Sequence, residues 1–101
     1  MKPQVIKYRI KEKSFIAKIA AANLGSDNVA MVIGRTIYLH NVSRKDFLRD
    51  KRWLAHEQAH LKQYKDHGTV SFLWKYLIES IKNGYYENKF EVEAREAEQK
   101  F

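Results

Sequence analysis

Two histidines four residues apart, His56 and His60, constrain this chain more than any other feature. At 3.6 residues per turn such a pair lies on one face of an α-helix, so both imidazoles can reach a single ion. Glu57 follows the first histidine and lies about 100° further around the helix. From there its carboxylate can accept a proton from a water molecule that the ion holds. Residues 56–60 therefore predict a helix that carries a metal site.

The spacing His-Glu-x-x-His is typical of zinc hydrolases, although a surface helix with two unrelated histidines has the same pattern. The chain holds no cysteine, which excludes zinc fingers, other thiolate metal sites and a disulfide framework. A catalytic zinc commonly has three protein ligands and one water molecule. We therefore expect a third ligand, which must be His, Asp or Glu, on a later part of the chain.

The last predicted helix offers two candidates for this third ligand. Glu91 precedes Ala94 by three residues, so both lie on one helix face. A small residue beside the ligand lets this helix approach the motif helix closely. Glu93 has Glu96 at the same offset, which is bulkier and charged. Glu91 is therefore the first candidate, and Glu93 is the alternative.

Hydrophobic periodicity predicts an α+β domain around the motif helix, with a short antiparallel sheet packed on about four helices. Apolar residues make up 45% of the 101 residues, which favours one globular domain over 1–101. The expected strands cover residues 5–10, 29–33 and 36–40, and the expected helices cover 15–24, 44–49, 51–65, about 69–83 and 89–98. Gly34-Arg35 predicts a tight hairpin with a type II′ turn, and a single bulged strand is the alternative.

Several residues are expected to begin or end these helices. Side chains of the capping type precede four of them, and glycines follow three. The expected N-caps are Ser14, Ser43, Asp50 and Asn88, and the expected terminating glycines are Gly25, Gly68 and Gly84. Residues 85–87 are expected to form a short aromatic loop.

The motif at 56–60, followed by Glu91-x-x-Ala94, resembles the gluzincin clan of zinc metallopeptidases, whose short members, the minigluzincins, are similar in length to this chain. The resemblance covers about residues 29–98 in the order of elements. It implies a zincin-like fold, Zn²⁺ held by His56, His60 and Glu91, and peptide-bond hydrolysis by a zinc-activated water with Glu57 as general base. It also implies an edge strand, for which residues 36–40 are the candidate, along which an extended peptide would lie.

One position departs from the gluzincin pattern. Many gluzincins place Asp or Asn directly after the small residue, where its side chain accepts a hydrogen bond from a ligand histidine, whereas this chain has Arg95. A cation cannot accept that bond, so we expect the acceptor to be Asp66, Glu87 or a backbone carbonyl. This departure makes catalytic efficiency less secure than metal binding.

Five further side chains are considered for roles at the site. Tyr85 and Tyr86 can stabilise an oxyanion, but we favour aromatic packing for both. Gln63, three residues after His60, is either a hydrogen-bonding partner within the site or a solvated helix residue. His40 and His67 have no spacing that recruits them.

The net charge is +7 and is unevenly distributed. Residues 1–50 carry ten Lys/Arg and four Asp/Glu, a balance of +6, whereas residues 51–101 carry nine and eight, a balance of +1. We interpret the basic half first as solvated surface, with a nucleic-acid-binding face as the alternative. The cations Arg35, Arg44, Lys45 and Arg49 have neither interleaved aromatic residues nor a helix-turn-helix pattern beside them.

The chain offers no sign of export or membrane insertion. Lys18 interrupts the apolar stretch at 15–24, so no signal peptide is predicted, and no segment approaches the roughly 18 apolar residues of a membrane span. We therefore expect a cytoplasmic protein without a membrane partner.

Three hypotheses about function follow from these patterns. The first is a zinc metallopeptidase that acts on a peptide or protein substrate. The second is a zinc-binding, zincin-like interaction module without peptidase activity. The third is a small basic nucleic-acid-binding protein in which the histidines are incidental. Metal binding separates the third hypothesis from the first two.

Overall fold

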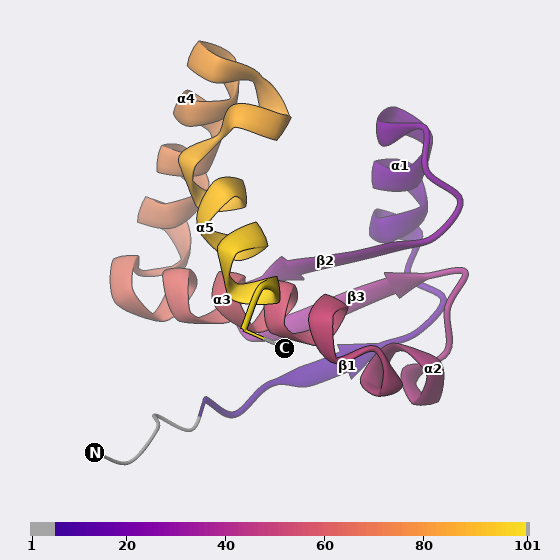
Figure 1. Cartoon of the computed structure of the whole chain (residues 1–101). Coiled ribbons are helices and arrows are strands. Elements are labelled where there is room, and N and C mark those ends of the chain that lie inside the picture. Colours follow the sequence, from indigo (N-terminus) through magenta and orange to yellow (C-terminus); the bar gives the residue numbers. More distant parts are fainter. Residues whose placement is uncertain (1–5, 101) are drawn as a thin grey trace.

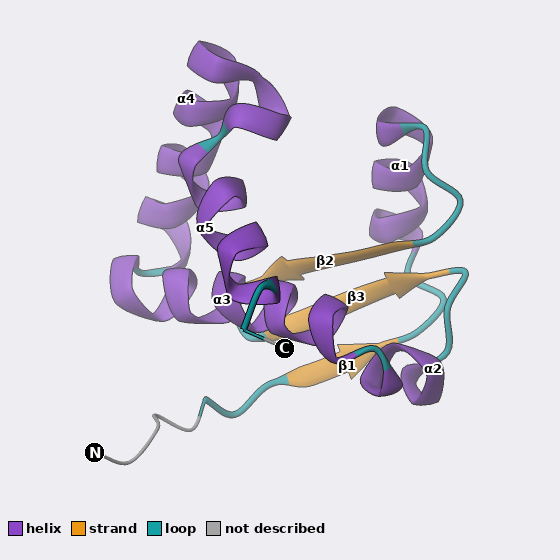
Figure 2. Cartoon of the chain, in the orientation of Figure 1, coloured by secondary structure: helices purple, strands orange, loops and turns teal. Residues whose placement is uncertain are grey.

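The computed structural model describes residues 6–100, which form a three-stranded mixed sheet and five helices (Figures 1 and 2). The elements in chain order are β1 (Arg9–Lys11), α1 (Phe15–Leu24), β2 (Val29–Ile33), β3 (Thr36–His40), α2 (Arg44–Arg49), α3 (Lys51–His67), α4 (Thr69–Glu87) and α5 (Lys89–Glu98). The prediction of an α+β fold is confirmed.

The sheet has the order β1-β3-β2. The prediction of an antiparallel sheet is wrong for β1, which pairs in parallel with β3, with Ile10 opposite Ile37. The expected edge strand at 36–40 is also wrong, because β3 lies between β1 and β2. The helix α1 connects β1 to the hairpin, and a connection of this kind permits the parallel pairing of β1 with β3, which a tight turn would not. The strand β1 is shorter than predicted, and Val5 lies outside the described residues.

The predicted hairpin between β2 and β3 is confirmed. Positive φ occurs at Gly34 (63°) and not at Arg35, as a type II′ turn requires. Ile33 and Thr36 close the hairpin. Because opposite pairs in an antiparallel ladder alternate, the N–H and C=O groups of Ala30 and Val32 point away from β3. The free edge of β2 can therefore accept another extended chain.

The two faces of the sheet pack against different helices. On one face, Ala17 and Ala21 of α1 pack on Val29 in a small apolar cluster. On the other face lies the larger core cluster, which joins the sheet to helices α2 to α5 and consists of Val32, Ile37, Leu39, Phe47, Leu61, Tyr64, Phe72 and Phe90. Figure 1 shows that α1 and the pair formed by α4 and α5 rise past β2 at opposite ends of that strand.

The predicted caps position the helices as expected. Ser14, Ser43 and Asp50 each accept a hydrogen bond from the backbone N–H three residues later. Gly25 adopts the left-handed conformation, with φ of 66°. Gly84, with φ of 80° and ψ of 167°, interrupts the helical conformation at the predicted position. One further helical turn follows this kink within α4 and replaces the expected aromatic loop. The motif helix α3 runs two residues beyond its predicted end.

Asn88 joins α4 to α5 and is fully buried. Its Oδ1 accepts a hydrogen bond from Phe90 N at 2.8 Å, which caps α5. Its Nδ2 donates to the Tyr76 carbonyl and to Ser80 Oγ, at 3.1 and 2.8 Å. One side chain thus sets the angle between the two helices and, with it, the position of Glu91 on the first turn of α5.

The helix α4 keeps only Phe72 fully in the core and leaves a broad apolar stripe in contact with solvent. The exposed large apolar residues of this stripe are Val70, Leu73, Trp74, Leu77, Ile78 and Ile81. No helix within residues 6–100 is long and apolar enough to cross a membrane.

Candidate metal centre

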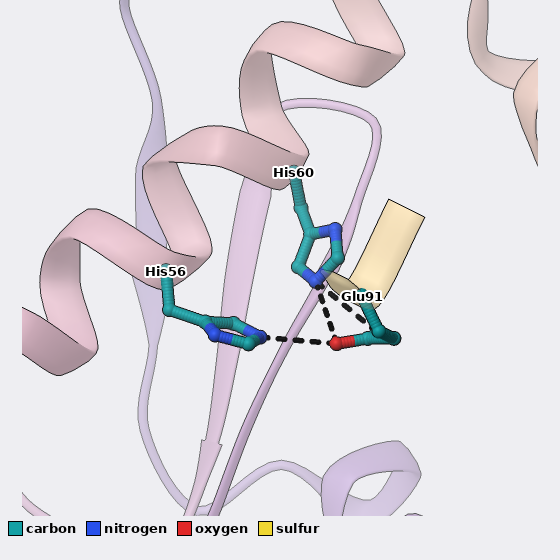
Figure 3. A group of neighbouring side chains, drawn as sticks. All are labelled: His56, His60 and Glu91. Atoms are coloured by element: carbon teal, nitrogen blue, oxygen red, sulfur yellow. Dashed lines mark hydrogen bonds and ion pairs between the residues drawn. The ribbon is translucent and has the colours of Figure 1, made fainter. Parts of the chain in front are cut away.

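The structure brings His56, His60 and Glu91 together, although 31 residues separate the second histidine from the glutamate. Glu91 Oε1 lies 3.0 Å from His56 Nε2 and 3.3 Å from His60 Nε2. Figure 3 shows both imidazoles, from neighbouring turns of α3, pointing toward this carboxylate. The predicted convergence of the two histidines with Glu91 is therefore present.

These separations suit a zinc ion. Three atoms that each lie about 2.0–2.1 Å from a tetrahedral zinc are about 3.3–3.4 Å from one another. The two nitrogen–oxygen separations lie close to that value, and one potential ligand atom from each residue falls within 4.8 Å of the others. Two imidazoles and a carboxylate are also a donor set that zinc accepts. The three residues can accordingly hold the ion with small movements.

Each histidine is oriented through its other ring nitrogen. Nδ1 of His56 contacts Glu98 Oε2 at 2.9 Å, and Nδ1 of His60 contacts Gln63 Oε1 at 2.8 Å. Both contacts favour the tautomer with hydrogen on Nδ1, which leaves Nε2 free to bind a metal. Glu98 thus provides support that the sequence analysis assigned elsewhere. Gln63 is a hydrogen-bonding partner within the site, which is the first of the two alternatives considered for it.

The acceptors predicted for this role were wrong. Asp66 pairs with Lys62 on the exposed side of α3, and Glu87 is exposed at the end of α4. Arg95, the residue that departs from the gluzincin pattern, donates to the backbone carbonyl of Tyr86 and lies over its ring at 3.9 Å. The guanidinium therefore holds the end of α4 against α5.

Gln63 links the motif helix to α5. Its Nε2 donates to the Phe90 carbonyl and to Glu93 Oε1, both at 3.0 Å. Glu93, the alternative third ligand, therefore lies outside the group formed by His56, His60 and Glu91. Its exposed carboxylate orients Gln63 and reaches the site only through that side chain.

Glu57 is 4% exposed and lines the cavity beside His56 and His60. Burial raises the pKa of its carboxyl group to about 8, and the negative charges of Glu91 and Glu98 act in the same direction, against the opposing charge of His60. In the metal-free protein this group is therefore largely protonated at pH 7, and the charge of a bound cation would favour the carboxylate form that a general base needs.

The two histidines and Glu91 each favour the charged form of the other. Burial disfavours the protonated form of both histidines, but hydrogen bonds and charge from Glu91 outweigh it and raise the pKa of His56 and of His60. Burial alone would raise the pKa of Glu91, yet hydrogen bonds from the two histidines and Tyr76 hold it well below its usual range. Without metal, the centre is thus a buried cluster of imidazole and carboxylate groups.

The structure adds a tyrosine that the sequence analysis did not single out. The Tyr76 hydroxyl donates to Glu91 Oε2. Of the tyrosines considered earlier, Tyr85 is half exposed and lines the cavity, whereas Tyr86 is exposed and meets Arg95, so neither is enclosed in the core. His40 and His67 lie outside the centre: His40 is on β3, and His67 contacts Lys75.

A cavity of about 380 Å³ opens beside the candidate centre. Its floor is β2, and α1 and α4 supply opposite walls through Leu24 and Leu73. A second cavity, of about 670 Å³, continues past His56 toward polar residues that include Asn28 and Asp50. The centre therefore lies where an apolar cavity and a more polar one meet along the free edge of β2.

The residues that hold His56, His60 and Glu91 in place differ in how well the sequence predicts their contacts. Glu98 follows Glu91 by seven residues, two helical turns along the same face, and Gln63 follows His60 by three. Both spacings could have been used to predict these hydrogen-bonding contacts. Tyr76 had none, because its contact with Glu91 depends on the angle that Asn88 sets between α4 and α5.

Comparisons of the chain with protein-family models, with curated proteins and with solved structures found no match. The resemblance to the gluzincins therefore rests on the two short motifs, and family membership stays a prediction.

Proposed function

We propose that this chain is a zinc-dependent metallopeptidase of the gluzincin type. The observation that carries the proposal is the convergence of two Nε2 atoms on one oxygen of Glu91, at 3.0 and 3.3 Å, with a buried carboxyl group beside them. The hydrogen bonds from both Nδ1 atoms add support, because ligand histidines in zinc sites ordinarily make such bonds.

The residues of the centre have separate roles in this proposal. His56, His60 and Glu91 would hold the metal ion, as three protein ligands do in catalytic zinc sites. Zinc held there would supply Lewis-acid chemistry, which lowers the pKa of a water molecule and polarises the scissile carbonyl. Glu57 accepts a proton at its carboxylate and delivers it to the leaving amine nitrogen. Burial of this carboxyl group keeps bulk water away from the proton.

The free edge of β2 suits an extended substrate. The outward amide groups of Ala30 and Val32 can pair with a peptide backbone, as in other cases of strand addition. Both residues line the apolar cavity next to His56. We therefore replace the strand at 36–40 with β2 as the proposed substrate-binding strand.

Metal analysis and peptide cleavage together test the proposal. After purification with zinc, we expect about one zinc per chain in the wild type and far less in His56→Ala, because that change removes a ligand. The wild type should cleave a mixed peptide library. Glu57→Gln should keep its zinc and lose about 10²–10⁴-fold of that activity, because general-base catalysis is typically worth this much.

Each result separates the rival hypotheses. A wild-type protein without zinc would refute the metal centre and leave the nucleic-acid hypothesis in front. Zinc binding without cleavage would favour an interaction module, for which the exposed apolar stripe of α4 provides a surface. Equal cleavage by the wild type and Glu57→Gln would assign the activity to a contaminant or to another site.

A further inference from the structure

The two carboxylate oxygens of Glu91 have different partners. Oε1 is the oxygen on which both histidines converge, at 3.0 Å from His56 Nε2 and 3.3 Å from His60 Nε2. Oε2 accepts the hydrogen bond of the Tyr76 hydroxyl and lies 3.2 Å from His60 Nε2. His60 Nε2 thus lies at a similar distance from both oxygens, and the Tyr76 hydroxyl holds the carboxylate in the rotation that also turns Oε1 toward His56.

We propose that Tyr76 is a positioning residue that holds the Glu91 carboxylate in the orientation in which it faces both histidines. This inference rests on the proposed zinc centre. Without the hydroxyl, the carboxylate can rotate about its terminal bond, and Oε1 would leave the position between the two Nε2 atoms. The hydroxyl therefore prepares Glu91 to act as a metal ligand together with His56 and His60.

The surroundings of the pair make this hydrogen bond effective. Glu91 is 4% exposed, so water cannot easily replace the tyrosine as donor to Oε2. The Tyr76 ring lies against Phe72 and Phe90, with ring centroids 5.8 and 6.5 Å away. Asn88 bonds to the Tyr76 carbonyl, which fixes this part of α4 against α5. The hydroxyl is thus held by packing on both sides of the bond.

Tyr76→Phe isolates the hydroxyl, because the ring and its packing remain. We expect this variant to bind zinc about 10–100-fold more weakly in competition with a chelator, as is typical when a partner of a metal ligand is lost. In the protein loaded with Co²⁺ in place of zinc, we expect weaker visible absorption than in the wild type. Four-coordinate cobalt absorbs more strongly than cobalt with five or six ligands, so the loss would report that a less firmly held Glu91 carboxylate allows further ligands to bind.

Tyr64→Phe serves as the matched control. Tyr64 is a buried tyrosine of the same core, and Phe72 is also its neighbour, at 4.5 Å between ring centroids. This control should keep the cobalt spectrum and the zinc affinity of the wild type. Melting of each metal-free variant establishes that it is folded.

The outcomes distinguish this inference from the proposed function. If Tyr76→Phe has the cobalt spectrum and zinc affinity of the wild type, Tyr76 does not position Glu91 and the inference is wrong. If Tyr64→Phe changes the cobalt spectrum and the zinc affinity as strongly as Tyr76→Phe does, core packing and not the Tyr76 hydroxyl controls the centre. That result would also overturn the inference. If the wild type binds neither metal, the proposed function itself fails.

Discussion

His56 and His60 owe their orientation to neighbours that act on Nδ1. Gln63 Nε2 donates to the Phe90 carbonyl, so the amide oxygen of Gln63 must face His60. An amide oxygen only accepts, and therefore Nδ1 of His60 carries the hydrogen. The ionised carboxylate of Glu98 requires the same of His56. In both residues Nε2 is then the nitrogen available to a metal, and both Nε2 atoms face Glu91.

Glu91 and Glu93 provide a direct test at the scale of single residues. Glu91→Gln removes the carboxylate on which both histidines converge and should weaken zinc binding by orders of magnitude. Glu93→Gln alters only the group beyond Gln63 and should change zinc affinity far less. Competition with a chromogenic chelator measures both. The reverse ranking would transfer the ligand role to Glu93 and undo the alignment with the gluzincin pattern.

At the scale of elements, the site depends on the close approach of α5 to α3. Ala94 is 0% exposed, as expected of a small residue on the face that meets the motif helix. The buried Phe90, one residue before Glu91, anchors the first turn of α5 in the main core. Asn88 fixes where that turn begins. Glu91, the proposed third ligand, is therefore placed by three residues that are not part of the candidate centre.

The sequence predicted the elements better than their arrangement. Caps and periodicity are local, so Ser14, Asp50 and Gly34 were sufficient to place helices and the hairpin. Strand order is not local, because β1 can pair with either hairpin strand without any change in its own pattern. Glu91 was predicted as a ligand candidate because it shares a helix face with Ala94. The contact of Tyr76 with Glu91 was not predicted, because it depends on an interhelical angle that no short pattern encodes.

The free edge of β2 yields a prediction for substrate binding. Ala30→Pro removes an N–H that points away from β3, so the sheet should keep its ladder and the protein should keep its zinc. A bound peptide would lose one backbone hydrogen bond, so kcat/KM should fall about 2–10-fold. Ala30→Ser, which keeps the N–H, is the control. Unchanged kcat/KM in Ala30→Pro would mean that substrate does not pair with this edge.

At the scale of the whole molecule, the distribution of charge is uneven. The excess of positive charge lies in the first 50 residues, whereas three carboxyl groups gather at the candidate centre, those of Glu57, Glu91 and Glu98. Two of these groups are nearly fully buried, and their ionisation must be balanced by the histidines or by a metal ion. The free energy of unfolding consequently depends on proton binding at the candidate centre.

The sign of this coupling can be derived for the metal-free protein. Burial raises the pKa of Glu57 from an ordinary value of 4.5 to about 8, so the folded state binds this proton more tightly than the unfolded state. The stability associated with that proton is fully present below pH 4.5 and is lost as the pH rises toward 8. The pKa values of His56 and His60 are also raised in the folded state, so their contributions are lost in the same direction above pH 6.5.

The last prediction follows from removing one of these groups. Glutamine cannot ionise, so metal-free Glu57→Gln should lose less stability than the wild type between pH 5 and 8. The difference in unfolding free energy between the two should grow with pH, with a slope of at most about 1.4 kcal/mol per unit. Urea unfolding in the presence of a chelator measures it, and Glu96→Gln, at an exposed position of α5, is the control. Parallel pH profiles for Glu57→Gln and the wild type would show that Glu57 is already ionised in the folded protein near pH 5. In that case the folded protein would not bind the proton of Glu57 more tightly than the unfolded chain does. The positive charge that stabilises the Glu57 carboxylate would then have to come from the protonated histidines beside it.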